Sequence, residues 1–299
     1  MDAILAHIIP KVVVTDLPEA NLESPYWLIN YQSLKFEVPF IGKMVDIQGT
    51  AGFLYGSILL YLLCVFLIFP LIKPQKTVTE RIALYHFGTI CVYSFIVFAS
   101  GFYHVISTGQ ISNFASFLCT PVPAWLRLVS ITFTLSKIWE WLDTAIFLWR
   151  QPQPWGDIRK IDFLHTYHHA TTFFLFLHVT NLPGDEKAGM IWNGFVHTLM
   201  YYHYGFRLPK SFRPIITFAQ IVQLASTTYW HSRYADTCPA FADYPEKHPF
   251  EYLVVYALVP VYLIFFIKFF IEEYIFKKEK KPASTSSTSV EVVKAKKQE

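Results

Sequence analysis

Three histidines lie within five residues of an otherwise apolar stretch that reads FLHTYHHATTFF, at 163–174. His165, His168 and His169 have the i, i+3 and i+4 spacing that places side chains on one patch of a helix. A single histidine in a membrane is often a hydrogen-bonded packing residue, but three on one patch favour chemistry. Imidazole can transfer protons near neutral pH, act as a nucleophile toward a thioester, or bind a transition metal.

Three other stretches place polar residues along one face of a helix. Each also has a structural interpretation: an ion pair near a helix end for KIWEWLDT, tyrosines at the membrane interface for NGFVHTLMYYHY, and amides that bond neighbouring helices for TFAQIVQ. The residues concerned are Lys137, Glu140, Asp143 and Thr144 in KIWEWLDT, Asn193, His197, Tyr201 and Tyr204 in NGFVHTLMYYHY, and Thr217, Gln220 and Gln223 in TFAQIVQ.

The elements that carry these residues are too apolar for an ordinary soluble domain. Of 299 residues, 53% are hydrophobic and 16% are charged, whereas charged residues make up about 25% of an average protein. Apolar blocks of about 20 residues indicate membrane-spanning helices, and the first residues lack the pattern of a removable signal peptide. We therefore expect an all-α integral membrane protein with seven transmembrane helices. The predicted spans are 51–72, 82–106, 126–149, 163–180, 188–206, 212–230 and 250–276.

The distribution of lysine and arginine predicts the orientation, because these residues concentrate in short cytoplasmic loops. The loops after the first, third and fifth spans are basic, whereas those between them carry few basic residues. This pattern places the N-terminus in the lumen or outside and the C-terminus in the cytoplasm. All four polar faces then lie in the cytoplasmic half or the middle of the bundle, which predicts one polar chamber open toward the cytoplasm.

Polar segments flank the predicted membrane domain. We divide the chain into a lumenal segment 1–50, a membrane domain 51–276, and a Lys/Ser/Thr-rich cytoplasmic tail 277–299 that we expect to be disordered. The tail ends in KKQE, in which Lys296 and Lys297 resemble a dilysine signal for retrieval to the endoplasmic reticulum. Adjacent lysines also arise by chance in a Lys-rich tail.

Four cysteines divide into two pairs by position. Cys64 and Cys91 lie in predicted spans and are expected to be buried apolar fillers. Cys119 and Cys238 lie in loops that the orientation places in the lumen, where disulfides persist. We therefore predict a Cys119–Cys238 disulfide, with two unrelated thiols as the alternative.

At its polar motifs the sequence resembles the ELO family of very-long-chain fatty acid elongases. Four family motifs occur in order over roughly 137–223, and the chain from about 50 to 276 is compatible with the family. One departure is His203, which stands where the family usually has a tyrosine. The motifs are KxxExxDT at Lys137, Glu140, Asp143 and Thr144, HxxHH at His165, His168 and His169, NxxxHxxMYxYY at Asn193, His197, Met200, Tyr201 and Tyr204, and TxxQxxQ at Thr217, Gln220 and Gln223.

The resemblance implies a 3-ketoacyl-CoA synthase of the endoplasmic reticulum membrane, which joins a long-chain acyl-CoA to malonyl-CoA and releases CO2 and CoA. It implies that helices 2–7 enclose a tunnel for the acyl chain, that helix 1 is peripheral, and that no metal or other cofactor is required. As partners it implies the lipid bilayer and the ketoacyl-CoA reductase, dehydratase and enoyl-CoA reductase of the elongation cycle. It implies no nucleic acid partner, and a homo-oligomer stays open.

The resemblance also assigns roles to individual residues. His168 would form the acyl-histidine intermediate, with His165 and His169 orienting it and supporting proton transfer. Asn193 and His197 would bind or polarise the malonyl thioester. Arg207, Lys210 and Arg213 are candidates for binding the CoA phosphates, although they also fit simple positive-inside topology. The residues implied to shape the chamber and bind substrate are Lys137, Glu140, Asp143, Tyr201, Tyr204, Gln220 and Gln223.

Two other classes of protein share part of this pattern. A membrane di-iron desaturase or hydroxylase uses several histidine boxes, whereas only one box stands out among the eleven histidines here; a mononuclear site made by the trio and His197 also stays open. A seven-helix receptor would share the orientation, but the sequence has neither D/E-R-Y after the third span nor NPxxY in the seventh.

Overall fold

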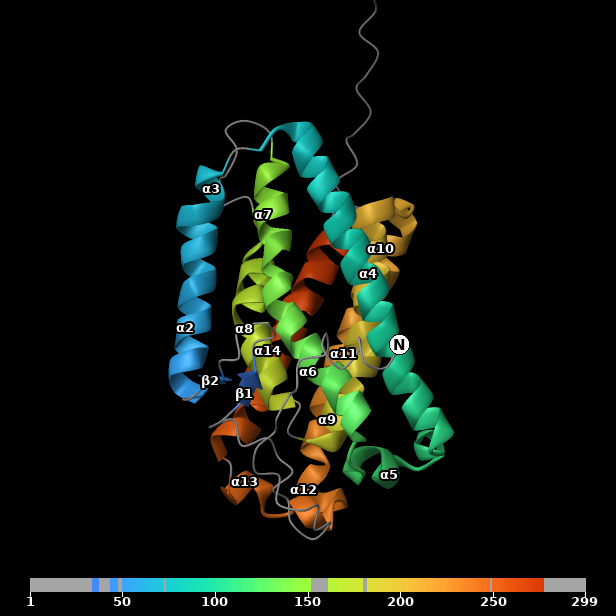
Figure 1. Cartoon of the computed structure of the whole chain (residues 1–299). Coiled ribbons are helices and arrows are strands. Elements are labelled where there is room, and N and C mark those ends of the chain that lie inside the picture. Colours follow the sequence, from blue (N-terminus) through green and yellow to red (C-terminus); the bar gives the residue numbers. More distant parts are fainter. Residues whose placement is uncertain are drawn as a thin grey trace, which may run out of the picture.

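The computed structural model describes residues 34–37, 44–47, 50–72, 74–151, 161–179, 182–247 and 249–276. Apart from one β-hairpin, the elements described there are helices (Figure 1). The longer helices are α2 (Thr50–Leu63), α4 (Lys76–Ser107), α6 (Ala124–Trp139), α7 (Trp141–Trp149), α8 (Phe163–Val179), α10 (Gly194–Phe206), α11 (Arg213–Ser232) and α14 (Pro249–Phe270). The shorter ones are α3 (Phe69–Leu71), α5 (Phe114–Cys119), α9 (Pro183–Ala188), α12 (Tyr234–Thr237) and α13 (Tyr244–Lys247). Three π-helical segments, Cys64–Ile68, Gly189–Asn193 and Ile271–Phe276, join or extend them, and 3-10 turns occur at Gln110–Ser112, Lys210–Phe212 and Pro239–Phe241.

Each predicted span is helical within the described residues, although some helices extend beyond the predicted ends. The span 126–149 is divided, because α6 ends at Trp139 and α7 begins at Trp141. Helical structure begins before the fifth predicted span, since α9, a π-helical segment and α10 follow one another directly. The sequence pattern therefore locates the helices well and their interruptions poorly.

The described residues include two helices long and apolar enough to cross a membrane, Lys76–Ser107 and Tyr252–Phe276, and a shorter apolar helix at Gly56–Leu71. This architecture is consistent with a helical membrane protein. The number of membrane crossings stays a prediction.

The terminal segments are described only in part. The hairpin of β1 (Leu34–Glu37) and β2 (Met44–Ile47) is antiparallel and lies in the predicted segment 1–50, where no strand is predicted. The tail 277–299, including Lys296 and Lys297, lies outside the described residues.

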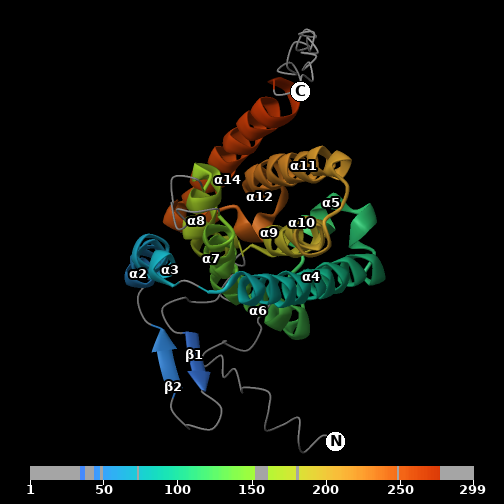
Figure 2. The same ribbon diagram turned by 90° about the horizontal axis from the view of Figure 1, so that it is seen from above.

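The longer helices form a closed ring. Around it, α10 packs on α4, α4 on α6, α6 on α8, α8 on α14, α14 on α11, and α11 on α10, with α7 continuing α6 (Figure 2). Helix α2 lies outside this ring and packs on α8, while α3 packs on α7. The first predicted span thus has the outer position expected of a peripheral helix.

Close packing of α10 on α4 depends on Gly194. A Cβ atom at this position would lie 3.0 Å from the backbone nitrogen of Phe98 and 3.1 Å from the carbonyl oxygen of Ser94. These distances are shorter than an ordinary van der Waals contact, so a larger residue would push the two helices apart. Glycine therefore brings the helix that carries Asn193 and His197 against α4.

The loops gather at two ends of the ring. Helices α5, α12 and α13 lie together at one end, and α3 lies at the other (Figure 1). At the first end a disulfide joins Cys119 to Cys238, with their Cα atoms 5.4 Å apart, so the structure contains the predicted pair. Around it lie the buried side chains of Leu118, Leu182, Tyr234, Phe241 and Tyr244.

The distribution of polarity fits a lipid environment. Large apolar side chains are exposed on the outside, while many charged and polar side chains are buried. Lipid offers no partner to an unpaired polar group, so such groups must find partners inside the bundle. Exposed examples are Leu67, Leu71, Val92, Phe95, Phe218 and Ile264.

Candidate active site

A break between α6 and α7 lies in the middle of KIWEWLDT. At Glu140, which separates the two helices, the N–H of Asp143 donates to the carbonyl oxygen of Glu140 at 3.0 Å. This bond spans three residues and is tighter than that of an α-helix. Lys137, Glu140 and Asp143 are each at most 1% exposed. The predicted polar face therefore points into the bundle.

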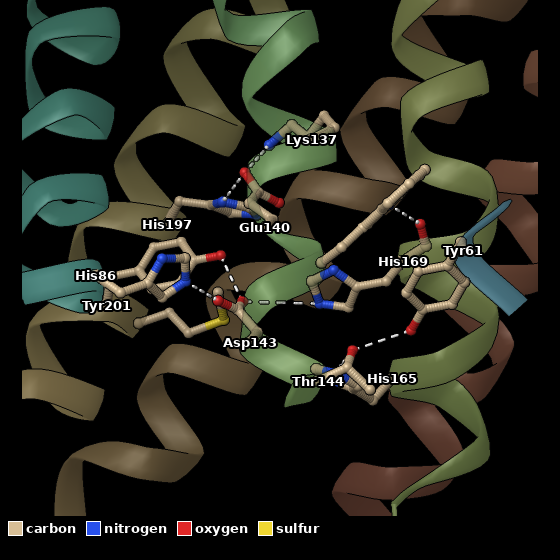
Figure 3. Close-up of polar contacts among 12 residues, drawn as sticks. Tyr61, His86, Lys137, Glu140, Asp143, Thr144, His165, His169, His197 and Tyr201 are labelled. Atoms are coloured by element: carbon tan, nitrogen blue, oxygen red, sulfur yellow. Dashed lines mark hydrogen bonds and ion pairs between the residues drawn. The ribbon is translucent and has the colours of Figure 1, made fainter. Parts of the chain in front are cut away.

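Lys137 is the centre of the first buried group. Its Nζ donates to Glu140 Oε1 at 2.8 Å (Figure 3). It also donates to Asn193 Oδ1 at 2.9 Å. The ammonium also lies 4.1 Å from the ring centroid of Phe133 and 4.7 Å from that of Phe176. A carboxylate, an amide oxygen and two aromatic faces thus compensate for the loss of water around this charge.

His197 joins the same group from α10. Its Nδ1 lies 3.4 Å from Glu140 Oε1, the oxygen that also accepts from Lys137. Four motif residues from two separate stretches, Lys137, Glu140, Asn193 and His197, therefore meet at one place. Two of the four polar faces that the sequence predicts thus form one buried group.

Asp143 is the centre of a second group directly beside the first. Its Oδ1 lies 2.5 Å from His86 Nε2, and its Oδ2 accepts from the Tyr201 hydroxyl at 2.7 Å. The same Oδ2 lies 3.9 Å from His169 Nε2. The carboxylate is thus surrounded by side chains of α4, α10 and α8 (Figure 3).

A hydroxyl relay reaches the first histidine of the trio. Thr144 Oγ1 lies 2.9 Å from His165 Nε2 and 3.0 Å from the hydroxyl oxygen of Tyr61. Tyr61 stands on α2, the helix outside the ring, and its ring packs on Trp141 with centroids 5.3 Å apart. The peripheral helix therefore contributes a side chain to the site.

The trio shares one patch, as its spacing predicts. The rings of His165 and His169 lie 4.2 Å apart, and those of His168 and His169 lie 5.4 Å apart. His168 is half-buried, and its ring lies 5.2 Å from that of Tyr262 and 6.4 Å from that of Phe266, both on α14. The outer histidines contact polar groups, whereas His168 packs against aromatic rings.

The remaining motif residues lie at the edge of this cluster. Tyr204 packs against the rings of Phe87 and Phe147, each 5.5 Å away. Gln220 Nε2 lies 3.8 Å from Met200 Sδ, and among the described residues the half-buried Gln223 side chain makes no hydrogen bond. The two glutamines of TxxQxxQ thus lie on α11 without contacting the charged groups around Lys137 and Asp143.

The candidate phosphate-binding cations lie between α10 and α11. Arg207, Lys210 and Arg213 are all exposed. Arg207 has a left-handed φ of 55°, which ends α10. Arg213 Nε donates to His203 Nε2 at 3.2 Å. The residue that departs from the family motif therefore joins α10 to the first residue of α11 by a hydrogen bond.

Sequence reasoning missed two residues of the site, His86 and Tyr61. His86 is 4% exposed, and Tyr61 is fully buried. Each stands alone in a predicted span and belongs to none of the four motifs. A signal was available, because burying a polar side chain in a membrane helix is costly unless it has a polar partner, and both residues lie in apolar spans.

A further buried charged group lies in α9, near the disulfide end. The N–H groups of Gly184 and Asp185 donate to the Tyr234 hydroxyl, the latter at 2.9 Å, and so cap the helix. Asp185 Oδ2 lies 2.5 Å from His231 Nδ1, and His231 Nε2 lies 3.0 Å from the carbonyl oxygen of Tyr252. Burial raises the pKa of Asp185, which His231 partly offsets.

The next two residues of α9 are equally buried. Glu186 Oε2 lies 2.9 Å from Arg127 Nη1, while Lys187 Nζ donates to Gln110 Oε1 at 2.8 Å and to the carbonyl oxygen of Thr120 at 2.7 Å. Burial raises the pKa of Glu186 to about 7, although Arg127 lowers it. Burial lowers the pKa of Lys187 to about 7, against the opposing effect of Glu186.

The described residues contain no group of three or more His, Cys, Asp or Glu side chains arranged to hold a metal ion. They therefore offer no observation in favour of a di-iron site. What the histidine cluster can do is place the imidazole of His168 beside that of His169, while ring nitrogens of His165 and His169 face Thr144 and Asp143. Such an arrangement suits nucleophilic attack and proton transfer.

The chain is similar to known proteins over most of its length. A candidate fatty acid elongase of Dictyostelium discoideum is 25% identical over 90% of this chain and 89% of its own length. Very long chain fatty acid elongase 4 of Homo sapiens is 29% identical over 75% of this chain and 71% of its own length. Elongase 2 of Rattus norvegicus is 32% identical over 54% of this chain and 56% of its own length. Residues 47–282 match the family model described as ELO, the GNS1/SUR4 family. This chain belongs to the ELO family.

Proposed function

We propose that this protein condenses a long-chain acyl-CoA with malonyl-CoA to give a 3-ketoacyl-CoA, CO2 and CoA. Its family and relatives support a role as an enzyme of fatty acid elongation. The observation that supports condensation is the arrangement of the trio. His165 and His169 face Thr144 and Asp143, while His168, whose ring lies 5.4 Å from that of His169, is half-buried against aromatic rings.

Two steps through His168 balance the reaction. In the first, a ring nitrogen attacks the thioester carbon, the C–S bond breaks, and the CoA thiolate takes up the proton that the imidazole loses. In the second, malonyl-CoA loses CO2 and the electron pair of the broken C–C bond forms an enolate. The enolate carbon attacks the acyl carbon, the C–N bond to His168 breaks, and the imidazole regains a proton from solvent.

Lys137 and Glu140 support the second step through Asn193 and His197. Because the Asn193 oxygen accepts from Lys137, its amide NH2 is the group that can donate to the thioester oxygen of malonyl-CoA. His197 lies on the same helix, one turn further on, and faces Glu140. Together they can stabilise the negative charge that forms on that oxygen as CO2 leaves.

The ring of helices supports a position for the acyl chain. An acyl chain would lie in an apolar tunnel within the ring formed by α4, α6–α7, α8, α14, α11 and α10, with α2 outside. CoA would bind at the exposed cations Arg207, Lys210 and Arg213.

The location of the enzyme is part of the same proposal. The enzyme would span the endoplasmic reticulum membrane with seven helices and have its N-terminus in the lumen. There its 3-ketoacyl-CoA product would be the substrate of a ketoacyl-CoA reductase, followed by a dehydratase and an enoyl-CoA reductase.

The test uses purified protein, labelled malonyl-CoA and a panel of acyl-CoAs of different length and unsaturation. We expect a two-carbon extension without added metal or electron donor. With acyl-CoA alone, mass spectrometry should find an acyl adduct on His168. Product that is desaturated or hydroxylated, and dependent on iron, would support the di-iron alternative.

Two variants of α8 distinguish a loss of the nucleophile from a general disturbance of the helix. His168→Ala should abolish both the adduct and condensation, whereas Thr166→Ala, two residues away on the same helix, should retain them. Unimpaired condensation by His168→Ala would contradict the assigned role.

A further inference from the structure

We infer that His86 is a positioning residue, which holds the Asp143 carboxylate toward His169 and so makes His169 the group that takes the proton from His168 and passes it to the CoA thiolate. This inference rests on the proposed function. His86 belongs to none of the family motifs recognised in the sequence, and it acts through Asp143 rather than by touching substrate.

The contacts of Asp143 carry the inference. Both carboxylate oxygens contact side chains of other helices: Oδ1 lies 2.5 Å from His86 Nε2, and Oδ2 accepts from Tyr201 at 2.7 Å. Two opposed contacts fix the rotation of the carboxylate. In this orientation Oδ2 lies 3.9 Å from His169 Nε2 (Figure 3).

The protonation states follow from the partners. An ionised carboxylate only accepts hydrogen bonds, so the proton of His86 lies on Nε2. His86 Nδ1 is buried without a hydrogen-bond partner, and a second proton there would create an unpaired buried donor and charge. With Asp143 ionised, as we infer here, His86 donates to it from Nε2.

That charge influences the tautomer of His169. At 3.9 Å, beyond hydrogen-bond range, the charge of Asp143 acts on His169 through its electric field and favours the proton on Nε2, which leaves the lone pair on Nδ1. His169 Nδ1 is buried without a hydrogen-bond partner, and the ring lies 5.4 Å from that of His168. A carboxylate also stabilises the imidazolium that forms when His169 takes a proton.

The other outer histidine lacks this arrangement. His165 Nε2 faces the neutral hydroxyl of Thr144 at 2.9 Å. A hydroxyl can donate or accept, so it neither fixes the tautomer nor stabilises a positive charge as a carboxylate does. The two outer imidazoles therefore differ, with His169 the base and His165 a neutral support.

The site allows His86 to be changed without a large packing defect. Its ring contacts Phe87 and Trp139 at centroid distances of 5.3 and 6.1 Å. It also lines a groove of about 460 Å³, together with Ile82 and Leu142. A leucine keeps much of this apolar contact but has no donor, while an asparagine keeps an N–H donor.

The experiment compares His86→Leu and His86→Asn with the unchanged protein. It measures CoA release from acyl-CoA alone, kcat and KM of condensation, and the dependence of kcat on pH. We expect His86→Leu to lower kcat about tenfold or more, with little change in KM, and to shift the limb of the pH profile that reports the base. His86→Asn should restore most of the rate and the original profile.

Several outcomes would overturn the inference. One is a folded His86→Leu variant with unchanged kcat and pH profile, and another is a folded His86→Asn variant as slow as His86→Leu. If either variant fails to fold, 15N NMR of the unchanged protein decides, since a proton on Nδ1 of His169 contradicts the assignment. Absence of CoA release by the unchanged protein would instead contradict the proposed acyl transfer itself.

Discussion

The hydroxyl oxygen of Tyr61 lies 3.0 Å from Thr144 Oγ1, although Tyr61 stands on the helix outside the ring. Thr144 in turn contacts His165, so α2 reaches the histidine trio through a single side chain. A helix that is peripheral in position is therefore connected to the site by hydrogen bonding.

Removing this hydroxyl should weaken the site without disturbing its packing. Tyr61→Phe keeps the ring contact with Trp141 but loses one buried hydrogen bond, worth about 0.5–1.5 kcal/mol of unfolding free energy. Acyl transfer should fall less than in Thr144→Val, which removes the direct contact with His165. Tyr85→Phe on the exposed surface of α4 is the control and should match the unchanged protein in thermal unfolding and CoA release.

A single substitution in the Lys137–Glu140 pair should lower the free energy of unfolding far more than substitution of both residues. Lys137→Met leaves Glu140 charged and buried, which should cost about 3–5 kcal/mol in thermal unfolding experiments. The double variant Lys137→Met/Glu140→Leu removes both charges and should recover most of that stability while staying inactive. Additive effects of the two single variants would contradict a coupled pair.

Gly194→Ala should separate α10 from α4. The new Cβ would meet the backbone of Phe98 and Ser94, so we expect a loss of about 1–3 kcal/mol and a larger loss of activity, because Asn193 and His197 move with the helix. Gly88→Ala is the matched control, since its Cβ would meet nothing within 4 Å and alanine favours a helix by up to about 1 kcal/mol. Equal melting temperatures for the two variants would contradict the close contact.

Loss of the Cys119–Cys238 disulfide should destabilise the loop end of the bundle. The bond closes a loop with a sequence separation of 119 residues, and removing such a bond typically costs about 2–5 kcal/mol. A reducing agent should lower the melting temperature of the unchanged protein and of Cys64→Ser. It should leave Cys119→Ser/Cys238→Ser unaffected, and a further drop in that variant would point to another cause.

The buried residues of α9 should give stability an unusual dependence on pH. Folding raises the pKa of Glu186 from 4.5 to about 7, so its contribution to stability is present below pH 4.5 and is lost as the pH rises through about 7. Folding lowers the pKa of Lys187 from 10.5 to about 7, so its contribution is present above pH 10.5 and is lost as the pH falls through about 7. Together the two groups predict a minimum near neutral pH.

Single substitutions separate the two contributions. Glu186→Gln should flatten the falling limb below pH 7, and Lys187→Met should flatten the rising limb above it. Chemical unfolding at a series of pH values measures both. A falling limb that survives in Glu186→Gln would assign it to another group.

Much of the fold follows from the sequence because apolar blocks of about 20 residues have few alternatives to a helix. The break at Glu140 does not follow, since the polar spacing continues through it and neither Gly nor Pro marks it. The hairpin of Leu34–Glu37 and Met44–Ile47 had a local signal, because apolar and polar residues alternate over Leu34–Glu37 and Pro39 and Gly42 lie between the two strands in the sequence.

The site could be predicted only as far as local spacing reaches. Helical periodicity correctly puts Lys137, Glu140 and Asp143 on an inward face. Their partners come from distant positions: His86 is 57 residues from Asp143, and Tyr61 is 83 residues from Thr144. Such pairings depend on which helices are neighbours, and a single sequence does not state this.

The packing of His168 against Tyr262 and Phe266 has a consequence for biosynthesis. Both aromatic residues stand on α14, the last of the described helices, which also closes the ring between α8 and α11. While the chain is still being translated, the helix that bears His168 exists without the wall that covers it. The aromatic packing around this histidine is therefore completed only as the ribosome finishes the chain, and an early stop codon before α14 would leave every motif present but His168 without these contacts.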